Sequence, residues 1–507
     1  MTILHKLREW EVQDSPYFEN LLSKALDKMR RAQAEWRRLP VRERLKPLHR
    51  LRERLTRESD LFAKSISNES GKTPLESLSQ EVIPMLDTLD FLERNAEETL
   101  RSKTVKVRTR QFYFWGKENE IRLEPFGVIG ILGTWNYAFY LTLSQMLFAL
   151  VAGNGVLVKS APESERTTDL IRELLESAGF PQHLWFCFTA GQQGGEVLTK
   201  AGCDKYILTG SRATGRAVLK TLAGDLKPAT VELSGCDAYV ILGDADWKLA
   251  TRTLMWAAFQ YSGQTCVAPR RVFVLEEDKE RFLAHFRAAW EKNADFLSSV
   301  GMLRSVDKAR VEKEKILKLR DAGAVLEIGL GDFDMSTAYF PPQVYSGLSA
   351  RQLDNIDFFS PTVFVLAYRT EQEILEAVNQ SRFGLAASLW TRDHAKARTW
   401  SREIQAGQVL VNDAIFSAAL GEVPFGGTKE SGFGRTRGRE GLLELVQPKF
   451  VSFDWRAKRT DVHLPPYKLE TYDILTHLQR FLYEPKLSRR WKALMDMTKT
   501  VFGGKNK

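Results

Sequence analysis

The chain has 507 residues, of which 43% are hydrophobic and 27% are charged, values typical of a soluble globular protein. Because one hydrophobic core rarely supports so many residues, we expect two or three lobes. The formal net charge is +9, but residues 456–507 hold twelve Lys or Arg and five Asp or Glu, so most of the excess lies in the tail. This distribution argues against a basic surface that binds nucleic acid.

The sequence shows no pattern of a secreted, membrane-spanning or metal-binding protein. No stretch approaches the roughly 18 apolar residues that a membrane span requires, and residues 1–10 carry charges where a signal peptide needs an apolar core. The four cysteines, at 187, 203, 236 and 266, have neither CxxC spacing nor a nearby histidine at metal-ligand spacing. We therefore expect a cytoplasmic protein without a metal site or a disulfide framework.

The chain before Pro125 and the chain after it follow different patterns. Apolar residues at helical spacing predict helices between about residues 15 and 105, and alternating apolar and aromatic residues predict strands between Val107 and Leu123. After Pro125 short apolar runs alternate with helical patterns. Strands are expected at residues 127–132, 156–158, 185–188, 206–208 and 230–233, and near 271–275, 362–367, 387–390 and 409–411. Such alternation predicts an α/β protein with two parallel-sheet lobes and ligands at the carboxyl ends of the strands.

Cys266 is the candidate nucleophile. It lies after a long apolar helix pattern, between Gly263-Gln264-Thr265, which we expect to be flexible, and Pro269. A cysteine attacks as the thiolate, so it needs an electropositive or hydrogen-bonding setting. An isolated cysteine is more often an ordinary buried residue, and none of the seven histidines falls in the motifs to form a Cys-His dyad. The case for Cys266 therefore depends on other parts of the chain.

Two further polar residues stand at the ends of predicted strands. Glu232 either caps a turn or enters a site, where partial burial would raise its pKa toward that of a useful base. Asn136 either caps a helix or donates its amide to an oxyanion. Together with Cys266 they supply a nucleophile, a base and an oxyanion donor.

Residues 206–215 predict a strand, a turn and the start of a helix. Gly210 allows a ligand to approach the backbone closely, and the amides of a helix N-terminus suit a pyrophosphate. The pattern is not the six-position GxGxxG fingerprint, so a plain tight turn is an equally good interpretation.

Six motifs in order make the chain resemble the aldehyde dehydrogenase superfamily over about residues 15–460. They are Gly133-Thr134-Trp135-Asn136-Tyr137, Gly210-Ser211 with Gly215, Glu232-Leu233-Ser234-Gly235, Gly263-Gln264-Thr265-Cys266, Phe359-Ser360-Pro361, and Pro424-Phe425-Gly426-Gly427-Thr428-Lys429-Glu430-Ser431-Gly432. The Trp135-Asn136-Tyr137 segment and Leu464-Pro465-Pro466-Tyr467 are most similar to the class 3 branch, which handles fatty and aromatic aldehydes.

The resemblance implies a role for each candidate. Cys266 would attack the aldehyde carbon to give a thiohemiacetal, whose oxyanion is held by the Asn136 side chain and the backbone N–H of Cys266. After a hydride has left for NAD or NADP, a thioester would remain. Glu232 would then activate the water that releases the carboxylic acid.

The resemblance also implies which residues hold the NAD or NADP. They are Trp135, Lys159, Gly210, Ser211, Gly215, Asp357 and Phe359. Among them Lys159 would reach the adenosine ribose, Gly210 and Ser211 the pyrophosphate, and Asp357 and Phe359 the nicotinamide ribose.

Four positions depart from the family pattern. Ser160-Ala161-Pro162 follows Lys159, so the carboxylate that commonly binds the adenosine ribose is missing unless Glu163 replaces it. Its loss weakens the selection for NAD, and we expect NADP to be tolerated. Asp357 is one methylene shorter than the usual Glu, Ser360 stands where Gly is usual, and Cys236 stands where Lys is common.

The family pattern divides the chain into four parts. The resemblance predicts an NAD(P)-binding domain from residues 1–106 and 126–234, a catalytic domain from 235–445, bridging strands at 107–125 and 446–460, and a basic amphipathic tail at 461–507. Because the bridging strands pair subunits in this family, we expect a homodimer.

Aromatic residues near the motifs suggest an apolar aldehyde substrate, fatty or aromatic. They are Tyr137, Tyr140, Trp256, Phe259 and Phe416. The alternative is that several of them belong to the core, where aromatic residues are common.

The tail contains a second amphipathic pattern. Its apolar residues near one helical face are Leu487, Trp491, Leu494, Thr498, Val501 and Phe502, with basic residues largely elsewhere. Such a helix could lie on an anionic membrane surface as a peripheral contact. The alternative is that it packs on its own subunit or on the dimer mate.

Two other functions remain open at this stage. A CoA-acylating dehydrogenase would pass the acyl group to CoA, but enzymes of that kind that resemble this fold usually lack the base at Glu232. A non-catalytic family member would act as a binding or structural protein. The presence of Cys266, Glu232 and Asn136 argues against it.

Overall fold

The computed structural model of the chain describes residues 16–106, 116–330, 332–455, 465 and 469–503. Contacts between residues divide the chain into two units, one of residues 1–100 and 125–447 and one of residues 101–124 and 448–507. The predicted bridging segments fall partly outside the described residues.

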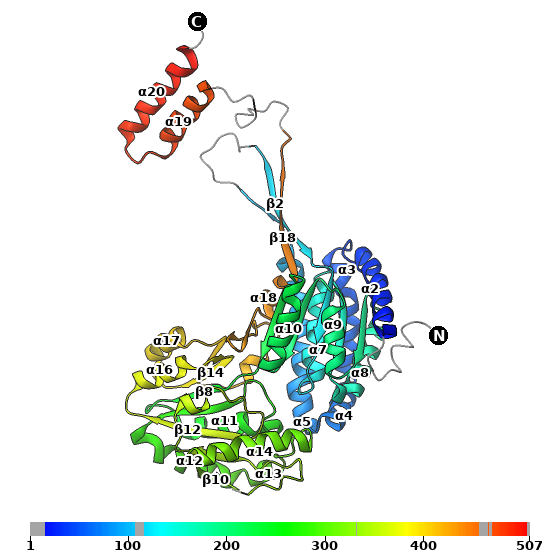
Figure 1. The fold of residues 1–507 in the computed structure, drawn as a ribbon, viewed down its shortest axis with the longest axis vertical. Coiled ribbons are helices and arrows are strands. Elements are labelled where there is room, and N and C mark those ends of the chain that lie inside the picture. The colour runs from blue at the N-terminus through cyan, green and yellow to red at the C-terminus, as the bar shows by residue number, and fades with distance from the viewer. Residues whose placement is uncertain (1–15, 107–115, 331, 456–464, 466–468, 504–507) are drawn as a thin grey trace. The chain divides into compact units, whose positions relative to one another are not determined.

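A six-stranded sheet forms the first lobe of the larger unit (Figure 1). Its strands are, in spatial order, β17 (Gly432–Phe433), β7 (Ala229–Leu233), β6 (Lys205–Gly210), β3 (Val128–Leu132), β4 (Gly155–Ser160) and β5 (Trp185–Thr189). All are parallel except β17, which runs antiparallel to β7. The β-runs predicted between residues 127 and 233 are therefore confirmed.

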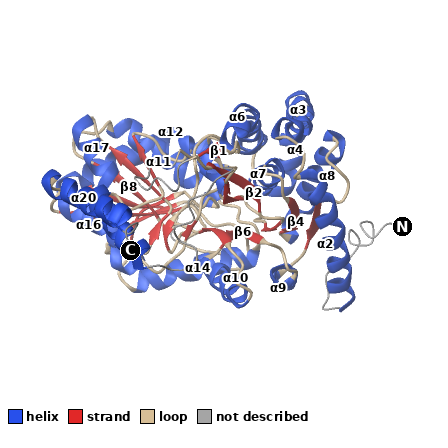
Figure 2. Ribbon diagram, turned by 90° about the horizontal axis from the view of Figure 1, so that it is seen from above, coloured by secondary structure: helices blue, strands red, loops and turns tan. Residues whose placement is uncertain are grey.

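Helices cover both faces of this sheet, which is why its strands are apolar throughout (Figure 2). The helices on one face are α2 (Pro16–Trp36), α9 (Gln192–Lys200) and α10 (Arg212–Gly224), which share one hydrophobic core with the sheet. The other layer consists of α7 (Ala138–Val151), α8 (Glu165–Ala178), α3 (Val41–Arg57) and α6 (Ile83–Thr99). Between α3 and α6 the chain forms α4 (Ser59–Ser70), α5 (Pro74–Ser77) and one π-helical turn, η1 (Leu78–Val82).

A seven-stranded sheet forms the second lobe. Its strands are, in spatial order, β10 (Val325–Gly329), β11 (Gln343–Ser346), β12 (Thr362–Tyr368), β9 (Pro269–Leu275), β8 (Asp237–Ile241), β14 (Ala386–Trp390) and β15 (Gln408–Val411). Only β10 is antiparallel to its neighbour. Sequence patterns predicted four of these strands and missed β8, β10 and β11. Only three residues separate β8 from β7, so both strands read as one apolar stretch.

Helices also cover both faces of the second sheet. One face carries α11 (Trp247–Phe259), α12 (Lys279–Lys292) and α13 (Ala294–Ser298), and the other carries α14 (Val306–Asp321), α15 (Ala350–Leu353), α16 (Glu371–Gln380) and α17 (His394–Glu403). The smaller elements are η3 (Pro162–Ser164), η4 (Gln260–Gly263), η5 (Glu276–Asp278), η6 (Phe416–Ala419), α18 (Gly438–Leu443) and a ribbon of β13 (Phe383–Gly384) with β16 (Thr428–Lys429). The predicted α/β fold with two parallel-sheet lobes is confirmed.

The second unit contains a small sheet and a pair of helices. The sheet has the order β1 (Lys103–Thr104), β2 (Glu118–Pro125) and β18 (Val446–Phe453), and the helices are α19 (Leu469–Tyr483) and α20 (Leu487–Gly503). The two helices pack on each other as a hairpin. None of the helices in the described ranges combines the length and the apolar character that crossing a bilayer would need.

Candidate active site

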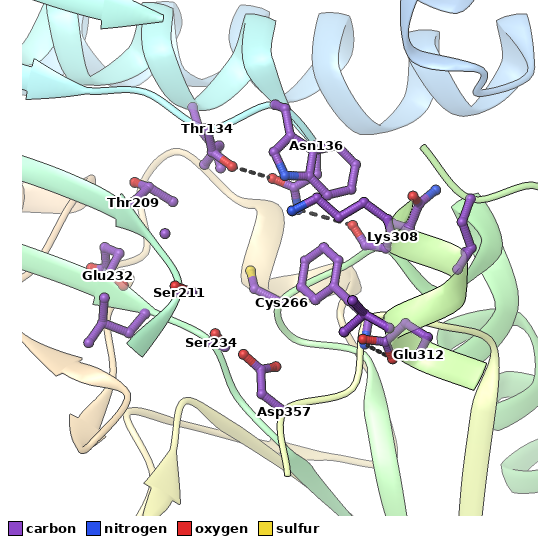
Figure 3. Close-up of a pocket in the computed structure, with 18 of the residues that line it drawn as sticks. Thr134, Asn136, Thr209, Ser211, Glu232, Ser234, Cys266, Lys308, Glu312 and Asp357 are labelled. Atoms are coloured by element: carbon purple, nitrogen blue, oxygen red, sulfur yellow. Dashed lines mark hydrogen bonds between the residues drawn. The ribbon is translucent and has the colours of Figure 1, made fainter. Parts of the chain in front are cut away.

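A cavity of about 280 Å³ lies at the carboxyl ends of β3, β6 and β7, opposite α14 and the loop before β12. Eight of the ten predicted site residues line it: Trp135, Asn136, Gly210, Ser211, Glu232, Cys266, Asp357 and Phe359. Lys159 and Gly215 are not among the lining residues. Figure 3 shows residues of both lobes around Cys266, with Asn136 and Glu232 from the first lobe and Asp357 from the second.

The loop that carries Cys266 is tightly packed. Tyr261 and Ser262 have φ angles of 48° and 54°, and Gly263 has a φ of 72°. A Cβ on Gly263 would lie 2.5 Å from the carbonyl oxygen of Ser360, so no larger residue fits there. Ser262, Gln264 and Thr265 are all buried. The prediction that the segment before Cys266 is flexible is therefore wrong.

A buried arginine holds this loop in its unusual conformation. The guanidinium of Arg270 donates to the carbonyl oxygens of Gly263, Ser360 (2.7 Å) and Ala258 (3.3 Å). Arg270 is itself only 1% exposed. One planar group with several N–H donors thus binds three backbone carbonyls from different parts of the chain.

The Cys266 side chain is partly exposed to the cavity. Burial raises the pKa of its thiol to about 12, and the charges of Asp237 and Glu232 act in the same direction. The residue is therefore a thiol at neutral pH, and its proton must leave when the sulfur attacks a carbon.

The Asn136 side chain is directed at the Cys266 loop. Its amide nitrogen donates to the carbonyl oxygen of Gln264 at 3.0 Å, and its amide oxygen accepts from the Thr134 hydroxyl at 2.9 Å (Figure 3). An amide nitrogen carries two N–H groups. With one N–H used by Gln264, the second can serve a ligand oxygen in the cavity.

Glu232, on β7, is a buried carboxyl without protein partners. It is 4% exposed, and neither of its oxygens has a hydrogen-bond partner among the described residues. Burial raises its pKa well above the ordinary value, although the charges of Arg437 and Arg435 oppose the shift. Gly426 makes room for it, because a Cβ there would lie 2.8 Å from the carboxyl oxygen Oε1. Such a group suits general-base chemistry.

The turn after β6 has the geometry of an anion site. β6 ends at Gly210, and the Ser211 hydroxyl caps α10 by accepting from the backbone N–H of Thr214 at 3.2 Å. Ser211 borders the cavity, so the N-terminus of α10 begins at the cavity wall. Gly215 has a packing contact instead: a Cβ there would lie 2.7 Å from the Leu233 side chain, so it lets α10 approach β7.

The loop before β12 contributes the opposite wall. The ring centroids of Trp135 and Phe359 are 5.8 Å apart, in a T-shaped arrangement. One carboxyl oxygen of Asp357, Oδ1, is buried without a hydrogen-bond partner among the described residues. Burial raises the pKa of this carboxyl, against a hydrogen bond from Ser234. An unsatisfied oxygen beside the cavity fits a ligand hydroxyl.

Glu312 and Lys315 on α14 hold this loop, and the sequence analysis missed both. One Glu312 oxygen accepts from the Phe359 backbone N–H and from the Ser360 hydroxyl, both at 3.0 Å. Lys315 donates to the other Glu312 oxygen and to the Asp357 carbonyl. Ser360, which departs from the family pattern, therefore has a defined partner. Lys308, Val311, Glu312 and Lys315 all line the cavity from α14 at helical spacing, the one sequence signal that could have revealed them.

Lys159 lies near the end of β4. Burial lowers the pKa of its ammonium, and the charge of Glu163 opposes the shift. Glu163 follows Pro162 in the short helix η3, so a carboxylate stands near Lys159 despite the altered motif.

The aromatic residues proposed as a substrate funnel do not line the cavity. Phe259 is fully buried in the core of the second lobe, and Phe416 is 71% exposed. Tyr140 is buried, with its hydroxyl donating to the Ala419 carbonyl at 3.0 Å. The funnel prediction is wrong for the buried Tyr140 and Phe259, because aromatic spacing does not distinguish a core face from a cavity face. For Tyr137, Trp256 and Phe416 it stays a prediction.

Comparison with known proteins gives consistent results. Residues 18–451 match the model of the aldehyde dehydrogenase family. Two similar curated proteins are a 4,4'-diapolycopene aldehyde oxidase from Methylomonas sp., 32% identical over 91% of this chain and 87% of that protein, and aldehyde dehydrogenase family 3 member A2 from Macaca fascicularis, 28% identical over 82% and 85%.

Solved structures agree with the fold. An aldehyde dehydrogenase of Mycobacterium tuberculosis complexed with NAD+ matches with a TM-score of 0.80 and 26% identity, over 87% of this chain and 91% of that chain. The structure of PnpE with nicotinamide adenine dinucleotide matches with a TM-score of 0.79 and 25% identity, over 86% and 90%.

Replacing Glu232 by Gln should stabilise the protein, and more so at higher pH. The raised pKa means that the folded chain keeps this proton while the unfolded chain releases it above about pH 4.3. The free energy of unfolding of the wild type therefore loses a contribution as pH rises, and the variant does not. We expect a stability gain of more than about 1 kcal/mol at pH 8, shrinking toward pH 5, in urea unfolding curves.

Glu314→Gln, at an exposed position, controls for the substitution itself. A gain for Glu232→Gln that stays constant between pH 5 and 8 would contradict the assignment of a raised pKa to Glu232.

Proposed function

The chain belongs to the aldehyde dehydrogenase family and is an oxidoreductase that acts on aldehydes, and we propose that it oxidises apolar aldehydes, fatty or aromatic, to carboxylic acids with NAD or NADP. The observation that carries this proposal is the presence of Cys266, Asn136 and Glu232 around one cavity. Water, and not CoA, would accept the acyl group, since Glu232 is a buried base without protein partners.

In the proposed reaction the Cys266 sulfur forms a bond to the aldehyde carbon, the carbonyl π bond opens to leave an oxyanion, and the thiol proton passes to water. The Asn136 amide, already directed at the Cys266 loop through Gln264, would donate to the oxyanion together with the Cys266 backbone N–H. The bound nicotinamide would supply the hydride acceptor. Glu232, once ionised, would then take a proton from the water that attacks the thioester, and passing it to the leaving sulfur restores the thiol and releases the acid.

The residues present fit a dinucleotide. The N-terminus of α10 at Ser211 would receive the pyrophosphate, and the unpartnered oxygen of Asp357 would accept from a ribose hydroxyl. Trp135 and Phe359 would flank it with their rings. In this proposal residues 1–106 and 126–234 form the cofactor-binding domain and 235–445 the catalytic domain. The NAD-bound structures with this fold support it.

The lining of the cavity supports an apolar substrate. Its apolar residues come from both lobes and are Leu141, Leu233, Leu303, Val311, Phe359 and Phe425. An apolar lining with a few convergent polar groups favours a ligand with a hydrocarbon body and one polar end.

Replacing Cys266 by Ala should abolish the formation of reduced nicotinamide from a panel of aliphatic and aromatic aldehydes.

Asn136→Ala should lower kcat by about 100-fold, because one oxyanion donor is lost. Glu232→Gln should retain a first turnover but release the acid slowly. Cys236→Ala, a buried cysteine away from the cavity, is the matched control and should remain active. Turnover that survives Cys266→Ala, or that requires CoA, would refute the proposal.

NADP should support the reaction with a kcat/KM within about tenfold of that with NAD, because Pro162 stands at the position from which the family's usual carboxylate would repel a 2′-phosphate. Pro162→Glu should restore that repulsion and lower kcat/KM for NADP by about tenfold, with little effect on NAD. Pro162→Gln, of similar size but without charge, should leave the ratio of the two cofactors unchanged. Equal effects of both substitutions would show that charge at residue 162 does not select the cofactor.

We also propose that the C-terminal hairpin contacts anionic membrane surfaces. Leu487, Trp491 and Met495 repeat every four residues on α20 and are 65%, 57% and 56% exposed. The exposed Arg489 and Lys492 lie on other faces of the same helix. Within the described part of the hairpin, only Ala493 is buried. An apolar stripe with a tryptophan, on a helix whose other faces carry cations, suits the interface of an anionic bilayer. Homodimerisation through the bridging strands remains part of the same proposal.

The full-length protein should co-sediment with vesicles of phosphatidylcholine and phosphatidylserine, and a smaller fraction of it should co-sediment with vesicles of phosphatidylcholine alone. Trp491→Glu, or truncation after Tyr467, should abolish sedimentation, because the first puts a charge in the middle of the apolar stripe and the second removes the stripe. Ser488→Glu adds the same charge beside the stripe and should weaken binding only slightly. Equal and negligible sedimentation of all forms would favour packing on the protein itself.

A further inference from the structure

Lys72 and Glu81 form an ion pair that is completely enclosed, with side chains 0% and 1% exposed. Lys72 lies between α4 and α5, and Glu81 lies in the π-helical turn η1. No motif in the sequence pointed to either residue. Neither of them lines the cavity.

The Lys72 ammonium contacts the two loops that carry the predicted oxyanion donor and nucleophile. It donates to Glu81 and, at 2.6 Å, to the backbone carbonyl of Asn136. It also lies 4.0 Å from the ring centroid of Tyr137 and 4.3 Å from that of Tyr261. Tyr137 follows Asn136, and Tyr261 belongs to the loop that leads to Cys266. One cation therefore binds both loops at once.

Glu81 fixes the other side of the same junction. Its second oxygen accepts from the backbone N–H groups of Phe139 and Tyr140 at 3.0 and 3.1 Å. These are the first amides of α7, which begins two residues after Asn136. A carboxylate at a helix N-terminus is favourable both as a hydrogen-bond acceptor and through the helix dipole. The pair thus fixes the backbone from Asn136 to Tyr140.

The same turn, η1, makes a second connection to the nucleophile loop. The Tyr137 hydroxyl donates to the Gln80 side chain at 3.1 Å and is 2.8 Å from the hydroxyl of Thr265, the neighbour of Cys266. The Asn136 amide donates to the carbonyl of Gln264 in the same loop. These hydrogen bonds fix how the two loops lie against each other, and the Lys72 ammonium contacts both loops.

We propose that Lys72 is a positioning residue, which with Glu81 as its counter-ion holds the Asn136 amide at the Cys266 loop in the geometry that an oxyanion requires. A buried ion pair is a poor source of stability, because desolvation offsets the attraction between the charges. It does select one arrangement, since a shift of either loop takes a carbonyl acceptor or an aromatic ring away from the buried ammonium. The expected effect of Lys72 on catalysis rests on the proposed dehydrogenase function. The claim that Lys72 holds the two loops in place does not depend on that function.

The test is a double-mutant cycle of Lys72→Met and Asn136→Ala. Lys72→Met should lower kcat/KM for the aldehyde by about 10- to 100-fold through displacement of the amide, with the Kd for NAD unchanged within about twofold. In the Asn136→Ala background the same substitution should cost less than about twofold, because a residue that acts through Asn136 has nothing left to position. Lys205→Met is the matched control. It removes a buried ammonium that donates to Glu444 at the opposite end of β6, and its effect should be independent of Asn136.

Hydrogen exchange tests the geometric part without any activity. Lys72→Met should speed exchange in peptides covering residues 134–137 and 261–266, and Lys205→Met should not. If Lys72→Met does not fold, Glu81→Gln, which keeps the volume, takes its place in both experiments.

The inference is overturned if the double variant loses kcat/KM by the product of the two separate losses. It is also overturned if hydrogen exchange in the two loops stays unchanged. A wild type that oxidises no aldehyde, or an Asn136→Ala variant with full activity, overturns the proposed function instead. Exchange then still decides whether Lys72 holds the loops.

Discussion

The catalytic cavity depends on a backbone segment whose conformation is unfavourable by itself. Three consecutive residues, Tyr261, Ser262 and Gly263, have positive φ angles, which side chains other than glycine rarely adopt. Within the loop, the backbone and side-chain amides of Gln264 both donate to the Tyr261 carbonyl, at 3.1 and 3.2 Å. The segment is also held from outside, by Arg270 on the carbonyls of the second lobe and by Lys72 and Tyr137 from the first. The position of Cys266 is thus a consequence of both lobes together, and a strained path of this kind commonly marks a functional site.

The same region collects carboxyl groups that the protein does not satisfy. Glu232 and Asp237 are buried and Asp357 is partly buried, and each has at least one buried oxygen without a hydrogen-bond partner among the described residues. Burial raises the pKa of Asp237 to about 8 and also raises that of Asp357. A protein selected for stability alone would pair or expose such groups. Two of the three border the cavity, where a ligand or a water molecule can satisfy them, so the unfavourable burial is concentrated at the site.

A residue that departs from the family pattern can have its partner far away in the sequence. Ser360 brings a hydroxyl where glycine is usual, and Glu312 accepts it while also fixing the backbone of Phe359. Lys315 neutralises Glu312 and holds the Asp357 carbonyl. The loop is therefore held by a charged network on α14. A single position that differs from a motif says little until its partner is known.

The sequence alone determined the α/β class, most strands of both lobes and the residues with reactive groups at strand ends. It did so because buried parallel strands are continuous apolar runs, and because glycine, carboxylate and amide residues stand out beside them. Tertiary structure decided what borders the cavity and what lies in the core. The aromatic Phe259 is buried and Phe416 exposed, α14 supplies the opposite wall, and Gly215 packs on Leu233. It also decided that the Cys266 loop is tightly packed and that Lys72 donates to the carbonyl of Asn136. Those facts depend on contacts between residues far apart in the sequence, such as Lys72 and Asn136, 64 positions apart, which local spacing does not encode.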